Sequence, residues 1–169
     1  MKMNNNDILI RLRYALDIKD ADMVEIFGLG GIEITNQEVR DILLKVKNDG
    51  HEMDDEFQEN EYKKKLDNNQ LESFLNGLIT YKRGAADSDK PVPLTMNDRN
   101  VNNILLKKVK IALSLTSEDM LDILSDTGTI LSKSELSAVL RKEGHRNYKE
   151  CGDRYARNFL KGLALKYRE

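Results

Sequence analysis

The apolar residues of this chain recur at helical spacing, and the same spacing occurs twice. Within residues 8–16 they fall on one side of a helix that turns by about 100° per residue. The second occurrence lies 97 positions further along the chain. The residues are Ile8, Leu9, Leu12, Ala15 and Leu16, and then Leu105, Leu106, Val109, Ala112 and Leu113. This pattern predicts an amphipathic helix at the start of each of two related segments.

A longer comparison supports a duplication. Residues 5–45 and 102–142 align without a gap and share 12 identical positions of 41, including two adjacent asparagines at the start of each stretch. Near the end of each segment, the phrase FLNGL at residues 74–78 recurs as FLKGL at residues 159–163. We therefore expect the chain to consist of two copies of one helical unit.

The predicted fold class is all-α, with about eight helices in two four-helix units. Residues 1–84 are assigned to the first unit, residues 85–101 to a linker and residues 102–169 to the second unit. The linker contains both prolines of the chain, which disfavour helix. We expect the units to pack into one body with the linker outside.

Side chains that accept hydrogen bonds from free N–H groups mark the expected helix starts. Each third helix opens with an S/T-x-x-E capping box, formed by Thr35 or by Ser132 with a glutamate three positions later. The second helices are expected to start at Asp20 and at Ser117.

Glycines mark the expected helix ends and one close contact. Gly50, Gly84 and Gly144 are predicted helix stops. Gly77 and Gly162, by contrast, lie inside the fourth helix of each unit, where glycine costs about 1 kcal/mol relative to alanine. Their repetition predicts a close backbone approach.

Composition restricts the class of protein. The 27 basic and 29 acidic residues give a net charge of −2, which provides no global reason for binding nucleic acid or membranes. There is no apolar run of membrane-spanning length, and the first residues do not read as a secretory leader. A single cysteine excludes an intrachain disulfide. We therefore expect a cytoplasmic protein without a cofactor.

The first unit carries an additional charged stretch. The acidic segment 49–61 is followed by three consecutive lysines, and residues 51–66 are interpreted as a solvated excursion. A calcium site is not expected there, because the segment lacks the spacing and the glycine of a calcium loop. His51 and His145 would make only a weak metal site between the units, so we predict no metal.

With both units laid out, the chain resembles the bacterial YehS-like family of cytoplasmic proteins, which are built from a tandem domain of unknown function. The resemblance rests on N-N-D-I-L (5–9), R-Y-A-L (13–16), S-F-L-N-G-L-I (73–79), K-R-G (82–84) and H-R-N-Y-K-E-C-G-D (145–153). The acidic segment is extended relative to that family. The resemblance implies the tandem fold and brings no assigned activity or functional residues.

The candidate cluster with the most chemistry comprises His145, Asn147, Tyr148, Cys151 and Asp153. A nearby imidazolium would lower the pKa of the thiol and make it a nucleophile. The alternative, which we favour, is structural: Tyr148 packs under the loop, Asp153 caps the last helix and Cys151 fills an apolar gap. The first unit has no matching cysteine, which excludes a duplicated active site.

A second candidate is a basic surface on the second unit. Residues 102–169 carry a net charge of +4, whereas residues 1–84 carry −5. The possible nucleic-acid contacts on the last helix are Arg154, Arg157, Lys161, Lys166 and Arg168. The basic residues of each first helix, at positions 11, 13, 108 and 110, are interpreted as solvated flanks of the apolar stripe.

We therefore predict a non-enzymatic binding or regulatory module that contacts a protein partner or a second copy of itself. The alternative is an accessory protein that binds DNA or RNA through the second unit.

Overall fold

The all-α prediction is confirmed by a computed structural model, which describes residues 2–46, 59–84 and 92–168. These residues form eight helices and no strand, with only two isolated β-bridges, Lys2 to Glu59 and Lys45 to Tyr62. The helices are α1 (Asn5–Leu16), α2 (Asp20–Leu29), α3 (Asn36–Leu43), α4 (Asn68–Arg83), α5 (Val101–Ala112), α6 (Ser117–Ser125), α7 (Lys133–Leu140) and α8 (Asp153–Arg168).

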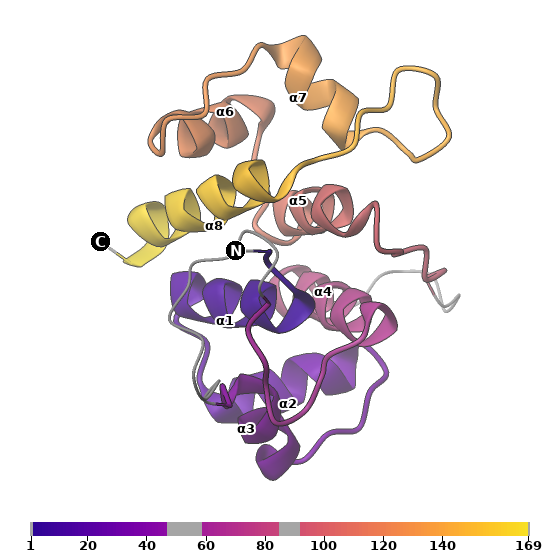
Figure 1. Cartoon of the computed structure of the whole chain (residues 1–169), viewed down its shortest axis with the longest axis vertical. Helices are drawn as coiled ribbons and strands as arrows, with labels where there is room; N and C mark the ends of the chain where they lie inside the picture. The colour runs from indigo at the N-terminus through magenta and orange to yellow at the C-terminus, as the bar shows by residue number, and fades with distance from the viewer. Residues whose placement is uncertain (1, 47–58, 85–91, 169) are drawn as a thin grey trace.

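The two units meet through their first and last helices. Helix α1 packs on α8, and α4 packs on α5, so each first helix lies against the last helix of the other unit. Figure 1 shows these four helices in the middle of the molecule, with α2 and α3 at one end and α6 and α7 at the other. Exchanging the two units therefore leaves the pattern of helix contacts unchanged, as a pseudo-twofold arrangement requires.

A buried asparagine joins three segments of the first unit. Asn6 on α1 donates to the carbonyl oxygens of Ile42 (2.9 Å) and Lys64 (2.8 Å), and its own oxygen accepts from the N–H of Leu66 (2.9 Å). These bonds satisfy backbone groups at the end of α3 and in the segment before α4. Asn6 therefore holds the chain entering α4 against α1.

The second unit contains the same arrangement. Asn103 donates to the carbonyl oxygens of Val139 (2.9 Å) and Lys149 (2.8 Å), and it accepts from the N–H of Cys151 (2.9 Å). Cys151 thus takes the position that Leu66 holds in the first unit. Asn6 and Asn103, the second asparagine of each repeated pair, therefore hold the matching segments of the two units together. We call these hydrogen bonds the asparagine frame.

The predicted close approach at the repeated glycines is present in both units. A Cβ atom at Gly77 would lie 1.9 Å from the carbonyl oxygen of Ile26, and one at Gly162 would lie 2.3 Å from that of Ile123. Phe74 and Phe159, three residues earlier, are both fully buried. The last helix of each unit consequently packs with its backbone against the second helix.

Two arginines join the units reciprocally. Arg83, at the end of α4, donates to the Ser114 hydroxyl (3.3 Å) and to the carbonyl oxygen of the third residue before it. Arg168, at the end of α8, donates to the Asp17 carboxylate (3.0 Å) and to the matching carbonyl oxygen on α1. Asp17 and Ser114 both have positive φ angles, 51° and 54°, at the ends of their helices. Each last helix therefore binds the turn after the first helix of the other unit.

Most described residues of the predicted linker, 92–101, are exposed, but this segment is also anchored on α4. Thr95 and Met96 donate their N–H groups to one oxygen of Glu72 on α4, both at 2.7 Å, and Met96 is buried. The second oxygen of Glu72 lies 3.3 Å from Nζ of Lys108 on α5. Lys108 was interpreted as a solvated flank, but it neutralises a fully buried carboxylate between the units.

The expected starts of α2 at Asp20 and of α6 at Ser117 are confirmed, but in each helix the N-cap is the residue before the predicted capping group. The N-cap of α2 is Lys19, without a side-chain cap, and Asp20 is the first helical residue. The N-cap of α6 is Thr116 instead of Ser117, and Thr116 forms a capping box with Asp119. Threonine and serine are both good caps, so composition alone did not distinguish them.

The capping boxes of the third helices also differ. In α7, Ser132 and Glu135 form the complete reciprocal box. In α3, Thr35 accepts from the N–H of Glu38 (3.1 Å), and the Glu38 side chain binds a lysine instead of returning to the Thr35 backbone.

Of the predicted glycine stops, Gly84 ends α4 with a positive φ angle of 86°. Gly144 also has positive φ (96°), but α7 ends at Leu140, so Gly144 belongs to a later turn. Gly50 and His51 lie outside the described residues.

The predicted excursion of the first unit is only partly described. Residues 59–66 are not a solvated loop: the Asn60 amide donates to the Asp7 carboxylate (2.9 Å), Tyr62 also donates to Asp7, and Leu66 is buried. These residues pack along α1. The remaining residues of the acidic segment lie outside the described part of the chain.

Candidate functional site

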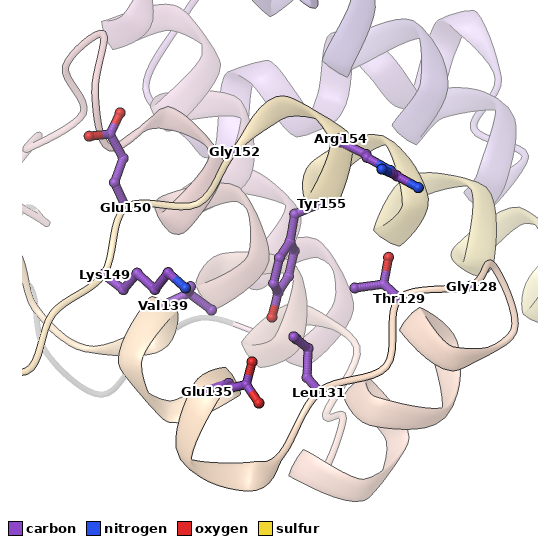
Figure 2. Close-up of a pocket in the computed structure, with 10 residues that line it drawn as sticks. All are labelled: Gly128, Thr129, Leu131, Glu135, Val139, Lys149, Glu150, Gly152, Arg154 and Tyr155. Atoms are coloured by element: carbon purple, nitrogen blue, oxygen red, sulfur yellow. The ribbon is translucent and has the colours of Figure 1, made fainter.

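The candidate site is a pocket of about 420 Å³ in the second unit. Its walls come from the turn between α6 and α7, from α7, from the segment between α7 and α8, and from the first turn of α8, as Figure 2 shows. The residues that line it are Gly128, Thr129, Leu131, Glu135, Val139, Lys149, Glu150, Gly152, Arg154 and Tyr155. Apolar walls with a few polar groups are typical of ligand sites.

The α6–α7 wall is held in place by α8. Thr127 donates its hydroxyl to the carbonyl oxygen of Asn158 (2.8 Å), and the Asn158 amide donates to the hydroxyl of Thr129 (2.7 Å). Between the two threonines, Gly128 has a positive φ of 90°, a conformation that favours glycine. The turn therefore keeps Thr129 and Leu131 at the pocket.

Three polar side chains enter the pocket from different elements. Lys149 comes from the segment before α8, Glu135 from the first turn of α7 and Tyr155 from the first turn of α8 (Figure 2). The Tyr155 hydroxyl is buried and has no hydrogen-bond partner among the described residues. Burial raises the pKa of Tyr155 above its ordinary value, and the neighbouring Cys151 and Glu135 act in the same direction. The hydroxyl therefore keeps its proton and can donate it.

The sequence-predicted cluster borders this pocket without forming a catalytic pair. Cys151 is buried, and its thiol contacts the Gly152 carbonyl oxygen at 3.7 Å. Burial raises its pKa to about 12, with a further contribution from Asp153. His145 is exposed, and its Nδ1 accepts from the N–H of Asn147 (3.1 Å). The hydrogen bond of His145 therefore lies within its own turn. The Cys151 thiol keeps its proton.

The remaining members of the cluster have structural contacts. Asp153 is the first residue of α8 and accepts from the Asn102 amide (2.9 Å) and from the N–H of Met3 (3.3 Å). Its predicted capping role is therefore replaced by a bond to the first unit. Tyr148 is half-buried under the loop, with a buried hydroxyl that has no partner among the described residues.

The basic residues of α8 do not form one free surface. Arg168 is held by Asp17 and lies 4.2 Å from the ring centroid of Tyr14, and Lys166 lies 5.9 Å from that of Tyr167. Arg154 and Lys161 are exposed, and they are seven residues apart on the same side of the helix. Arg157 is half-buried and engaged in an interaction of its own.

Sequence reasoning missed Glu135, Lys149 and Tyr155 as pocket residues. A signal was present in the alignment of the two units: Tyr155 stands where the first unit has Gln70, although Glu135 and Lys149 match residues of their own type there. The difference at this position, next to two charged residues that are the same in both units, was visible in the sequence.

Comparison with known proteins assigns the chain to a family. Residues 5–84 and 102–169 each match the family described as "Protein of unknown function (DUF1456)", and the chain belongs to this family. It is 38% identical over 165 residues to "Uncharacterized protein YehS" of Escherichia coli (strain K12), which covers 97% of this chain and 96% of that protein. No solved structure matches the chain.

Two further features bear on the class of protein. None of the helices in the described part of the chain is long and apolar enough to cross a membrane. Within the same residues, no group of three or more histidine, cysteine, aspartate or glutamate side chains is placed to hold a metal ion.

Proposed function

We propose that the protein is a non-enzymatic binding or regulatory module that acts through protein–protein contacts, using the surface around the pocket of the second unit. The observation that carries this proposal is Ile130, whose surface is 85% exposed. It lies between Thr129 and Leu131, which line the pocket. An exposed apolar side chain beside a concave site is the type of anchor that protein interfaces bury.

The first unit shows that the fold does not require an apolar residue at this position. The residue that matches Ile130 is Glu33, which is also exposed. The two turns are otherwise built alike, and the first unit has a glutamate at this position. The isoleucine side chain is therefore not needed to stabilise the turn. Its exposure is therefore better explained by a contact with another molecule.

The non-enzymatic part of the proposal is supported by Cys151 and His145. A nucleophilic cysteine needs a lowered pKa and access to substrate. Cys151 has a raised pKa and is buried, and the hydrogen bonds of His145 do not include the thiol.

Site-specific photo-crosslinking in the native cells tests the proposal. A benzoyl-phenylalanine residue at position 130 should give one or a few discrete adducts, whereas the same residue at position 33 should give none. An adduct of twice the chain mass identifies a second copy, and any other discrete mass identifies a different protein. Equal labelling at the two positions, or no adduct at position 130, would contradict the proposal.

Binding to DNA or RNA is the second candidate, and the exposed Arg154 and Lys161 on one side of α8 favour it. Phosphate contacts release counterions, so such binding weakens steeply as salt is added. Binding of duplex at about 100 mM salt that is lost with added salt and with Arg154→Ala would support this candidate. Absence of binding at that salt concentration would reject it.

A further inference from the structure

The pocket lies at a position where the first unit has an ion pair that has no counterpart among the described residues of the second. In the first unit, Nζ of Lys64 lies 2.6 Å from Oε2 of Glu38, and this pair joins α3 to the segment before α4. The matching residues of the second unit are Lys149 and Glu135. Among the described residues, Lys149 takes part in no ion pair, and both residues line the pocket.

The reason lies in the first turn of the last helix. In the first unit, Asp67 and Gln70 form a capping box, so Gln70 turns back onto the start of its own helix. In the second unit, the matching residues are Gly152 and Tyr155. Glycine has no side chain to take part in a capping box, and Tyr155 extends into the pocket beside Glu135 (Figure 2).

Three polar groups consequently line one space. They are the exposed ammonium of Lys149, the exposed carboxylate of Glu135 and the hydroxyl of Tyr155. One oxygen of Glu135 accepts from the N–H of Ser132 (3.3 Å), and the Tyr155 oxygen is buried without a partner among the described residues. A buried hydroxyl without a partner is destabilising, because it has lost its hydrogen bonds to water. Opposite charges in the same pocket disfavour a simple anion and a simple cation alike, because each would meet a like charge.

We propose that this pocket binds a small zwitterion of the amino-acid class with an apolar side chain. The ligand carboxylate binds Lys149 and accepts from the Tyr155 hydroxyl, the ligand ammonium binds Glu135, and the apolar side chain lies on Leu131 and Val139. The volume of about 420 Å³ accommodates a molecule of amino-acid or dipeptide size. This inference goes beyond the proposed partner contact and does not depend on it.

The test is a titration of the ¹⁵N-labelled full chain with L-leucine, L-phenylalanine and L-leucyl-L-leucine. We expect saturable shifts of the Gly128 and Gly152 amides, which line the pocket, and no shift of Gly31, the counterpart of Gly128 in the first unit. Isovalerate and isopentylamine carry a similar apolar group with one charge each. They should bind at least about tenfold more weakly, because each lacks one charged contact.

Two variants separate loss of the site from loss of the fold. Tyr155→Phe should weaken binding about tenfold. The double variant Gly152→Asp with Tyr155→Gln recreates the capping box of the first unit and should abolish binding while remaining folded. A Cβ atom at Gly152 meets no atom within 4 Å, so the aspartate fits.

The proposal is overturned if no zwitterion shifts these amides up to about 20 mM, where even weak ligands bind. It is also overturned if isovalerate or isopentylamine binds as tightly as L-leucine, or if the folded double variant binds unchanged. Because all these measurements use the isolated chain, they are independent of the crosslinking result at position 130.

Discussion

The two units have the same frame but different surfaces where the third helix meets the segment before the fourth. In the first unit, Lys64 and Glu38 form an ion pair, and the side chain of Gln70 caps the start of its own helix. In the second unit, residues of the same type, Lys149 and Glu135, line an open pocket that Tyr155 enters. Gly152 and Tyr155 thus stand in place of the Asp67–Gln70 capping box at the position where the second unit has its pocket.

The contacts between the units show a similar contrast. Helix α4 meets α5 through the buried ion pair of Glu72 and Lys108. The pseudo-twofold counterparts on α8 and α1 are Arg157 and Arg11, which are both basic. The two matched interfaces therefore differ in electrostatics, although the same helices form them.

The largest expected effect concerns this contrast between interfaces. Lys108→Met should destabilise the protein by about 3 kcal/mol or more, because it leaves the fully buried Glu72 carboxylate without its cation. Arg11→Met, at the matched position of α1, should change stability by less than about 0.5 kcal/mol. Urea unfolding of both variants measures the difference, and equal losses would refute the asymmetry.

The asparagine frame should be equally important in the two units. Asn6→Ala and Asn103→Ala each remove three hydrogen bonds to buried backbone groups and should each cost about 2–4 kcal/mol. Urea unfolding is again the measurement. A cost below about 1 kcal/mol for one variant and several for the other would show that the frames are not equivalent.

At the position shared by Leu66 and Cys151, the second unit has a titratable side chain where the first has none. Burial raises the Cys151 pKa from 9.0 to about 12, so the thiol stabilises the fold below pH 9, and this contribution is lost as the pH rises from 9 towards 12. Cys151→Val should therefore lose less stability than the wild type between pH 8 and about pH 10, with a difference of roughly 1 kcal/mol. Identical pH dependence by urea unfolding would contradict the assignment.

The smallest expected effect is a gain. Gly152→Asp with Tyr155→Gln should stabilise the protein by about 0.5–1 kcal/mol, because the new cap satisfies N–H groups at the start of α8 and places a negative charge there. Thermal unfolding measures the gain. Asp67→Gly with Gln70→Tyr in the first unit is the matched reverse change and should be destabilising. A loss of stability in the first variant would mean that the two helix starts differ in more than these residues.

The frame could be predicted from the sequence because it depends on local repetition. The apolar stripes, the glycines at 77 and 162, and the order of the helices all follow from patterns within one unit. The repeated asparagines were visible, but the hydrogen bonds of Asn6 and Asn103 span 36 to 60 positions, which periodicity does not report.

The pocket and the ion pair between the units could not be predicted in the same way. The roles of Lys108 and Glu72 depend on how the two units face each other, and helical spacing within α5 indicated only that Lys108 flanks the apolar stripe. The pocket depends on the direction of the Tyr155 side chain, which follows from the absence of a cap at Gly152. Both features arise from tertiary contacts.

The distance between Nζ of Lys149 and the Glu135 carboxylate in a crystal structure of the ligand-free chain tests the central claim most directly. The account predicts that this pair is separated, with the Tyr155 hydroxyl in the pocket, while Lys64 and Glu38 form an ion pair in the same crystal. An ion pair between Lys149 and Glu135 that fills the pocket would contradict it.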